Sequence, residues 1–276
     1  MKNIDKYEQY MDKTFPIINT PLQQRYDKIA AKWNSDVYEG TRRDDLIPTL
    51  IEAAKIRGDE KILEAMSGTA LLSKEIHVNY PECKLYALDF SRGMLNFAAD
   101  QIHKIQASVL AMPFANHSFD IIFLRSALYD LPKRFQLKGL QEIRRVLKPG
   151  GRFIFQTYYS PKGIGDTLNK IVNMKDLVSG QYQDIGREHP RYFATLEELT
   201  EWFEQAGFLY REVQKFEGYI RYLQTNEMNE LGKRMWIKYI TALPEAIKEK
   251  LKLKWENDQQ ELVYTFPGVI YVLFPK

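Results

Sequence analysis

The stretch that decides the fold of this chain is Lys61-Ile-Leu-Glu-Ala-Met-Ser-Gly-Thr-Ala70. Its first five residues have the composition of a short buried strand, and the residues from Leu71 onward have the pattern of a helix. A turn between a strand and a helix places free backbone N–H groups and a helix N-terminus beside an anionic ligand. One glycine, Gly68, is weak evidence for such a turn by itself, so the interpretation depends on the segments that follow.

Three later segments support a nucleotide-binding α/β fold. The strand pattern Lys84-Leu-Tyr-Ala-Leu-Asp89 ends in an acidic residue, Ala111–Asp120 leads into a second strand, and Val146-Leu-Lys-Pro-Gly-Gly-Arg-Phe-Ile-Phe155 joins a helix to a third. Short apolar strands that alternate with amphipathic helices predict a parallel sheet with right-handed crossovers. We expect strands near 61–66, 84–89, 105–109, 119–125 and 151–158, and helices near 70–79, 92–102 and 134–147.

The last third of the chain contains a well-marked helix and a buried final strand. Thr195 and Glu198 form a capping-box pattern, and Gly207 provides a stop signal, so a helix is expected between them. Residues 209–217 alternate as a strand, residues 226–257 have a helical pattern, and Gly268–Phe274 has the apolar pattern of a buried strand.

Length and composition indicate a globular protein without unusual features. The chain has 276 residues, 45% hydrophobic and 27% charged, and a net charge of +3 that is scattered along the sequence, which argues against a nucleic-acid partner. A single cysteine, Cys83, excludes an internal disulfide, and no histidine has the spacing of a metal site. No signal-peptide core and no membrane-spanning run are found, so a cytoplasmic location is expected. The sequence does not indicate the oligomeric state.

Taken together, these segments resemble the class I S-adenosylmethionine (SAM)-dependent methyltransferases, in particular the small-molecule branch with the ubiquinone and menaquinone methyltransferases. The resemblance is good over residues 22–160 and loose over 190–276, and it is closest at the family's LPF…FD and LKPGG signatures. The family's acidic residue followed by G-x-G-x-G is degenerate here, because Glu64 is followed by Met66, Gly68 and Ala70.

The resemblance implies an α/β fold with a seven-stranded, mostly parallel, doubly wound Rossmann-like sheet and a helical lid. We expect residues 1–57 to form an N-terminal helical lid. Residues 58–222 would form the SAM-binding core, interrupted by a lid insertion at 161–194, and residues 223–276 would contain a helical insertion and the final core strand. Proline at positions 16, 21 and 48 divides the N-terminal segment into short helices.

The resemblance also implies which residues bind SAM. Asp89 would accept hydrogen bonds from the ribose hydroxyls, as an acidic strand end does in dinucleotide sites. Phe90 and Met94 would flank the adenine, with plain packing as an equal alternative. Ser108 would accept from the adenine amine, or would be an ordinary strand-end serine, and Val109 would pack on the adenine edge.

Further contacts to SAM are expected from the turn and from the lid. Gly68 would let the backbone approach the ligand, whereas Met66 would place a side chain where the family has glycine. Glu64 keeps the acidic position that is linked to the amine of SAM. Tyr26 belongs to a helix that resembles the one closing over the methionine end of SAM. Arg125 lies at a strand end, where ligands bind in open α/β sheets.

The catalytic residues are not identified by the sequence. Tyr129 stands where relatives often have a histidine near the transferring methyl group, although packing is slightly favoured for it. His189 is the histidine that we would test as a base. The aromatic surplus suggests an acceptor pocket under the lid, with Tyr158, Tyr159, Tyr182 and Tyr192 as lining candidates.

The sequence therefore predicts methyl transfer from SAM to a small, apolar or aromatic acceptor. The alternative is a binding or regulatory protein of the same fold that has lost methyl transfer, which Met66, Ala70 and Ser108 favour. An RNA or protein methyltransferase is the least favoured interpretation, because neither a basic patch nor the Asn/Asp-Pro-Pro-Tyr tetrapeptide is present.

Overall fold

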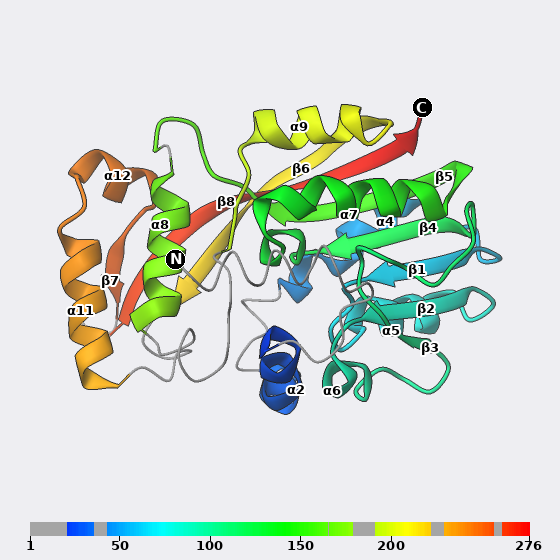
Figure 1. Cartoon of the computed structure of the whole chain (residues 1–276), viewed down its shortest axis with the longest axis horizontal. Coiled ribbons are helices and arrows are strands. Elements are labelled where there is room, and N and C mark those ends of the chain that lie inside the picture. The colour runs from blue at the N-terminus through cyan, green and yellow to red at the C-terminus, as the bar shows by residue number, and fades with distance from the viewer. Residues whose placement is uncertain (1–20, 36–42, 165, 179–190, 222–228, 257–260) are drawn as a thin grey trace.

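The computed structural model describes residues 21–35, 43–164, 166–178, 191–221, 229–256 and 261–276 (Figure 1). Within these ranges the strands are β1 (Lys61–Ala65), β2 (Lys84–Asp89), β3 (His103–Gln106), β4 (Phe119–Arg125), β5 (Leu147–Tyr158), β6 (Phe208–Arg221), β7 (Lys254–Glu256) and β8 (Glu261–Pro275). The helices are α2 (Pro21–Trp33), η2 (Asp44–Leu46), α4 (Ile47–Ala54), α5 (Leu71–Asn79), α6 (Arg92–Leu95), η3 (Leu128–Asp130), α7 (Lys133–Val146), α8 (Thr167–Val178), α9 (Leu196–Gln205), α11 (Glu230–Thr241) and α12 (Glu245–Lys250).

The strands form one sheet in the order β3-β2-β1-β4-β5-β8-β6, with β7 paired to β8 off this path. The first five strands run parallel, and β8 lies antiparallel between β5 and β6. This confirms the expected doubly wound sheet and the buried final strand, which lies between β5 and β6. The strand order reverses between β1 and β4, and ligands of open α/β sheets bind at the carboxyl ends of the strands at such a point.

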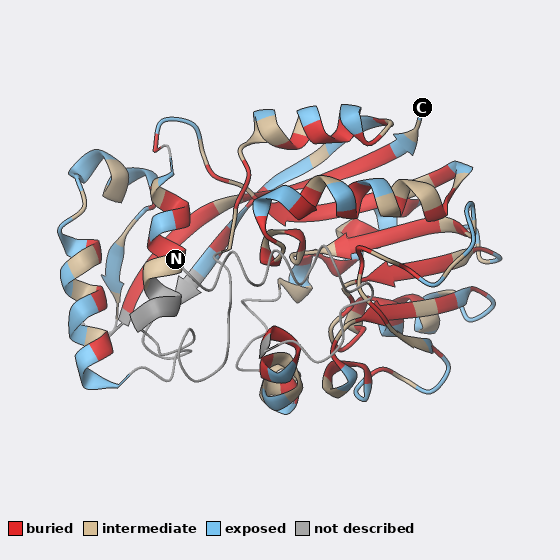
Figure 2. Cartoon of the chain, viewed as in Figure 1, coloured by how far each residue is buried: buried red, intermediate tan, exposed pale blue. Residues whose placement is uncertain are grey.

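Each face of the sheet carries its own apolar core, because successive residues of a strand point to opposite faces. Ile121 and Phe123 of β4 belong to the core cluster that also contains residues of α4 and α5, whereas Ile122 and Leu124 belong to the cluster with residues of α7 and α9. Figure 1 shows α7 and α9 on the same side of the sheet. The central strands are buried along most of their length (Figure 2).

Three expectations about individual elements were wrong. The expected helix over 92–102 ends at Leu95. After it, the backbone N–H groups of Phe97 and Ala98 donate to carbonyls three residues earlier, not four as in an α-helix, so the chain continues in tight turns. The third strand covers 103–106 instead of 105–109. Residues 254–256, expected to be helical, form β7, whose pairing with Glu261–Val263 gives the described sheet an eighth strand.

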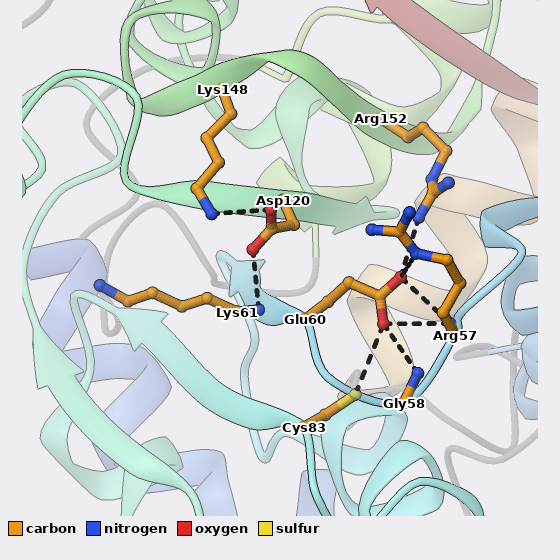
Figure 3. Close-up of polar contacts among 8 residues, drawn as sticks. All are labelled: Arg57, Gly58, Glu60, Lys61, Cys83, Asp120, Lys148 and Arg152. Atoms are coloured by element: carbon orange, nitrogen blue, oxygen red, sulfur yellow. Dashed lines mark hydrogen bonds and ion pairs between the residues drawn. The ribbon is translucent and has the colours of Figure 1, made fainter.

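A polar cluster lies at the amino ends of the strands, opposite the ligand-binding edge (Figure 3). Glu60, which is 1% exposed, accepts hydrogen bonds from the backbone N–H groups of Arg57 and Gly58 and from the guanidinium of Arg152. Beside it, Asp120 accepts from the N–H of Lys61, the first residue of β1, and pairs with Lys148. The cluster joins the starts of β1, β4 and β5 through charged side chains, of which Glu60 is buried and the others are partly exposed.

Candidate active site

The turn between β1 and α5 contains three residues with a left-handed backbone. Met66, Gly68 and Ala70 have φ angles of 53°, 54° and 56°. These are the positions at which the glycine pattern of the resembled family falls. A left-handed backbone costs roughly 1–2 kcal/mol for a residue with a Cβ, so Met66 and Ala70 hold a strained conformation. The shape of the glycine-rich turn is therefore present although two of its glycines are not.

Replacing Met66 with glycine tests whether this strain matters for ligand binding. Glycine removes the left-handed penalty but adds unfolded-state entropy and loses the apolar contacts of Met66 with the core. We expect a stability change of about 1 kcal/mol or less and a SAM affinity that is preserved or improved. Calorimetric titration and thermal unfolding measure both. Ala70→Gly is the matched control, because it relieves the same strain without removing a large side chain; a large affinity loss in folded Met66→Gly would identify Met66 as a ligand contact.

The middle of the turn carries a polar atom that lacks a protein partner. Ser67 Oγ is buried and makes no hydrogen bond within the described part of the chain. A Cβ added at Gly68 would lie 3.8 Å from Trp33 Nε1, so the C-terminal end of α2 lies close to the turn. A buried hydroxyl left unpaired is unfavourable unless a ligand or water satisfies it. The turn therefore suits a polar ligand group such as the methionine end of SAM.

Asp89 lies beside this turn at the end of β2. Its two carboxylate oxygens accept the backbone N–H groups of Gly68, at 2.8 Å, and Ser91, at 2.9 Å. Burial is the main cause that raises the pKa of Asp89 to about 6, against the lowering effect of these two hydrogen bonds. A carboxylate has about four lone-pair sites, so two remain for further donors. The geometry is compatible with the expected ribose contact, which stays a prediction.

Helix α2 is fastened over the segment that follows Asp89. Asp27 accepts hydrogen bonds from Ser91 Oγ and from the N–H of Gly93, both at 2.6 Å. The ring of Tyr26 meets the ring of Phe90 edge to face, with centroids 5.7 Å apart. The sequence argument missed Asp27, because nothing in a helical pattern shows that a carboxylate binds residues more than sixty positions away.

The contact between α2 and α6 depends on a glycine. A Cβ at Gly93 would lie 2.7 Å from the Cα of Asp27 and 2.9 Å from its carbonyl oxygen, and both are backbone atoms. We therefore expect Gly93→Ala to displace α2, to destabilise the fold by about 1–3 kcal/mol and to weaken SAM binding. Thermal unfolding and calorimetry measure these effects. Gly150→Ala is the control, because nothing lies within 4 Å of its added Cβ; equal behaviour of the two variants would contradict the prediction.

The residues expected around the adenine differ in burial, and Phe90 is half-buried. Met94 and Val109 are buried, and Ser108 is half-buried. Ser108 Oγ accepts from the N–H of Leu110, at 3.2 Å, so it serves as a local turn residue and can still donate its own proton. Gln106, which the sequence did not single out, donates to the carbonyl of Phe90 and holds that loop against β3.

Glu64 and Arg125 are engaged by partners within the protein. The carboxylate of Glu64 is buried and accepts from the N–H and the hydroxyl of Ser73, at 2.9 and 2.7 Å. Burial raises the pKa of Glu64, which the charge of Arg125 and the bonds from Ser73 partly offset. Arg125 pairs with Asp44 at 3.0 Å. Their contacts with α5 and η2 give both residues a structural role, and a direct contact with SAM stays a prediction.

A three-residue contact joins the N-terminal helix to the strand edge. The hydroxyl of Tyr26 donates to Asp130, at 2.8 Å, and Arg191 pairs with the other oxygen of the same carboxylate, at 2.9 Å. Tyr26 comes from α2, Asp130 from η3 after β4, and Arg191 from the last residues of the expected lid insertion at 161–194. The contact closes α2 over the carboxyl edge of the sheet.

The aromatic residues do not form a single pocket lining. Tyr129 stacks on Phe193 with centroids 4.5 Å apart, and burial raises its pKa well above the usual value, which favours packing over acid–base chemistry. Tyr158 belongs to the core on the α5 side of the sheet, whereas Tyr159 and Tyr192 pack against the core on the α7 side. The expectation that these three tyrosines share one pocket was wrong, because Tyr158 packs in the core on one face of the sheet and the other two pack against the core on the opposite face. Tyr182 and His189 lie outside the described residues.

Two further searches were limited to the described ranges. No group of three or more histidine, cysteine, aspartate or glutamate side chains there could hold a metal ion. No helix in these ranges combines the length and the apolar character needed to cross a bilayer.

Comparison with known proteins agrees with this geometry. The family profile described as Methyltransferase domain matches residues 63–155. The demethylmenaquinone methyltransferase of Lactiplantibacillus plantarum is 28% identical over 71% of this chain and 90% of its own length. Its counterpart from Mycobacterium sp. (strain JLS) is 29% identical over 55% of this chain, which spans 65% of that relative, slightly under two thirds.

A solved structure shows the same fold. The YcgJ protein of Bacillus subtilis superposes with a TM-score of 0.71 and 18% identity, over 84% of this chain and 98% of that one. The profile match covers β1 to β5, which carry the turn, Asp89 and the carboxyl edge of the sheet. The methyltransferase-domain profile and the named relatives therefore support a class I SAM-dependent methyltransferase of the quinone methyltransferase type, with SAM as its cofactor.

Proposed function

We propose that this protein transfers the methyl group of SAM to a small aromatic acceptor of the hydroquinone class. The observation that carries the proposal is the turn after β1, in which three left-handed residues, an unpaired buried hydroxyl and Asp89 converge. The acceptor class is supported by the names of the relatives, which are demethylmenaquinone methyltransferases.

The chain's own residues would act by binding and positioning. SAM supplies an activated methyl group on a sulfonium, and an acceptor held in line with it needs little further assistance. Asp89 would hold the ribose, Ser67 the methionine end, and Phe90 and Met94 the adenine. Helix α2, held by Asp27 and Tyr26, would cover the site and exclude water.

An oxygen acceptor must also lose a proton, and the described residues do not include an obvious base at the expected position. The environment of Tyr129 argues against that role. The hydroxyl of a hydroquinone is a phenol with a pKa of about 10, so water alone is a poor acceptor of its proton at neutral pH, and the transfer requires a base.

Calorimetric titration with SAM and S-adenosylhomocysteine, followed by turnover with labelled SAM and reduced naphthoquinones, tests the proposal. We expect both cofactor forms to bind and label to appear in the quinol. Absence of SAM binding would contradict the whole proposal. Binding with no transfer to any quinol of the panel would contradict the hydroquinone assignment.

The alternative is a SAM-binding protein of this fold without methyl transfer. Met66 and Ala70 favour it, because strained residues replace two glycines of the turn. The same fold supports different functions, so fold alone does not decide between them. Tight SAM binding that yields no methylated product with oxygen, nitrogen or carbon acceptors would favour this alternative.

A further inference from the structure

Helix α11 carries two parallel apolar stripes, and only one of them is buried. Gly232, Trp236 and Ile240 are spaced four residues apart and face the protein, where Trp236 packs toward Tyr264 of β8 with centroids 6.4 Å apart. Burying one stripe of this kind is what a helix on a globular core requires.

The second stripe is displaced by one residue and faces outward. Leu231 is 60% exposed and Met235 50% exposed, and Tyr239, the next residue at this spacing, is half-buried. Residues four apart lie on one face of a helix, so Leu231 and Met235 form a short apolar ridge, which ends where Tyr239 packs against the core. Large apolar side chains exposed singly are ordinary, but an ordered row of them on one helix face indicates a binding surface.

Basic residues flank this ridge. Arg234 and Lys238 are exposed, are also four residues apart and lie on the turn of the helix next to Leu231 and Met235. Glu230 is the one acidic residue of α11, and it pairs with Lys233 at 2.8 Å. The exposed face therefore combines apolar side chains with positive charge, which is the composition of helices that lie in the interface of anionic membranes.

The position of α11 permits such contact. Figure 1 shows α11 at the extreme end of the molecule, outside α8 and beyond the ends of β6 and β8, and Figure 2 shows exposed residues along its outer side. A flat surface that approaches this end of the molecule could therefore meet Leu231 and Met235.

We propose that the outer face of α11 docks on an anionic lipid surface, with Leu231 and Met235 inserted among the headgroups and Arg234 and Lys238 on the phosphates. Charge complementarity favours lipid over a second copy of the chain, because two copies of this face would bring like charges together. The proposal concerns location and does not depend on methyl transfer. A surface-bound enzyme would have access to acceptors that partition into lipid.

Vesicle co-sedimentation of the full chain tests this inference. We expect binding to vesicles of phosphatidylcholine mixed with phosphatidylglycerol, weaker binding to phosphatidylcholine alone, and loss of binding at high salt. The double variant Leu231→Gln/Met235→Gln should lower the partition coefficient by about tenfold or more. Arg234→Gln/Lys238→Gln should lower it by about tenfold and should remove most of the salt dependence.

The matched control is Val78→Gln/Leu209→Gln, which removes two apolar side chains of α5 and β6 that are slightly more exposed, 70% and 58%, than those of Leu231 and Met235. This control should bind vesicles as the unaltered chain does. Absence of binding to anionic vesicles, or equal partition of the α11 variant and the control, would overturn the proposal. Self-association that the α11 variant abolishes, with no vesicle binding, would overturn it in favour of a contact between two copies.

Discussion

Replacing Asp89 with alanine should weaken SAM binding by roughly 1–3 kcal/mol, the cost of removing a buried hydrogen-bonding partner. In the structure its carboxylate also accepts hydrogen bonds from the N–H groups of Gly68 and Ser91. The variant would therefore lose both the expected acceptor for the ribose hydroxyls and the two hydrogen bonds that hold the turn and the segment after β2. Calorimetric titration at a temperature where the variant is folded measures the loss. An unchanged dissociation constant would reject the ribose assignment.

The same residue predicts a pH dependence with a definite sign. Burial raises the pKa of Asp89 from 3.8 to about 6, so the folded protein without cofactor holds this proton more strongly than the unfolded chain does. Protonation of Asp89 therefore stabilises the folded protein without cofactor at pH values below 3.8, the pKa in the unfolded chain. This contribution to the free energy of unfolding, about 3 kcal/mol, is lost as the pH rises through about 6.

SAM binding should show the opposite trend over that interval. The ribose hydroxyls donate to the carboxylate, so affinity should increase as the pH rises through about 6. Asp89→Asn is the control, because an amide does not titrate there. Titrations at several pH values check the trend, and an Asp89→Asn variant with the same pH dependence would assign it to another group.

Replacing Glu60 with alanine should lower the free energy of unfolding by about 3–5 kcal/mol, the range found when one partner of a buried charge cluster is removed. Burial by itself raises the pKa of Glu60, but the N–H groups of Gly58 and Arg57 and the Arg57 side chain outweigh it, so the pKa is lower than usual. The variant would leave these donors and the guanidinium of Arg152 without their acceptor (Figure 3).

Urea denaturation measures this loss, and two comparisons make it specific. Asp120→Ala removes the neighbouring carboxylate, whose partner Lys148 is partly exposed, so a smaller loss of about 1 kcal/mol or less is expected. SAM affinity should be nearly unchanged in folded Glu60→Ala, because Glu60 lies at the opposite edge of the sheet from the turn. A stability loss below about 1 kcal/mol would show that the cluster is not a major support of the fold.

Some features followed directly from local patterns. The strands at 61–65, 84–89 and 119–125 were predicted within one residue, because each is a short apolar run bounded by polar residues. The helix after Thr195 was predicted because its capping box, Thr195 with Glu198, is a local signal, and both hydrogen bonds are present. By contrast, β7 was missed because its three residues become a strand only through pairing with Glu261–Val263.

Some residues of the candidate site could also be predicted from local patterns, and others could not. Asp89 and Gly68 could be singled out from strand-end chemistry and a turn signal, but Asp27, Asp44, Asp130 and Arg191 could not, because their partners lie far away in the sequence. Tyr158 and Tyr159 were expected to share a pocket, but Tyr158, the last residue of β5, and Tyr159, which follows it, pack against the cores on opposite faces of the sheet.

The sequence by itself determined the doubly wound sheet, the turn after β1 and the acidic end of β2, since hydrophobic period and turn residues act over a few positions. Only the tertiary structure decided that Met66 and Ala70 take a left-handed backbone, that Ser67 Oγ is buried without a partner and that α2 closes over the site. The physical reason is that packing between distant segments supplies the energy that holds a strained turn, and no local pattern records which segments will meet.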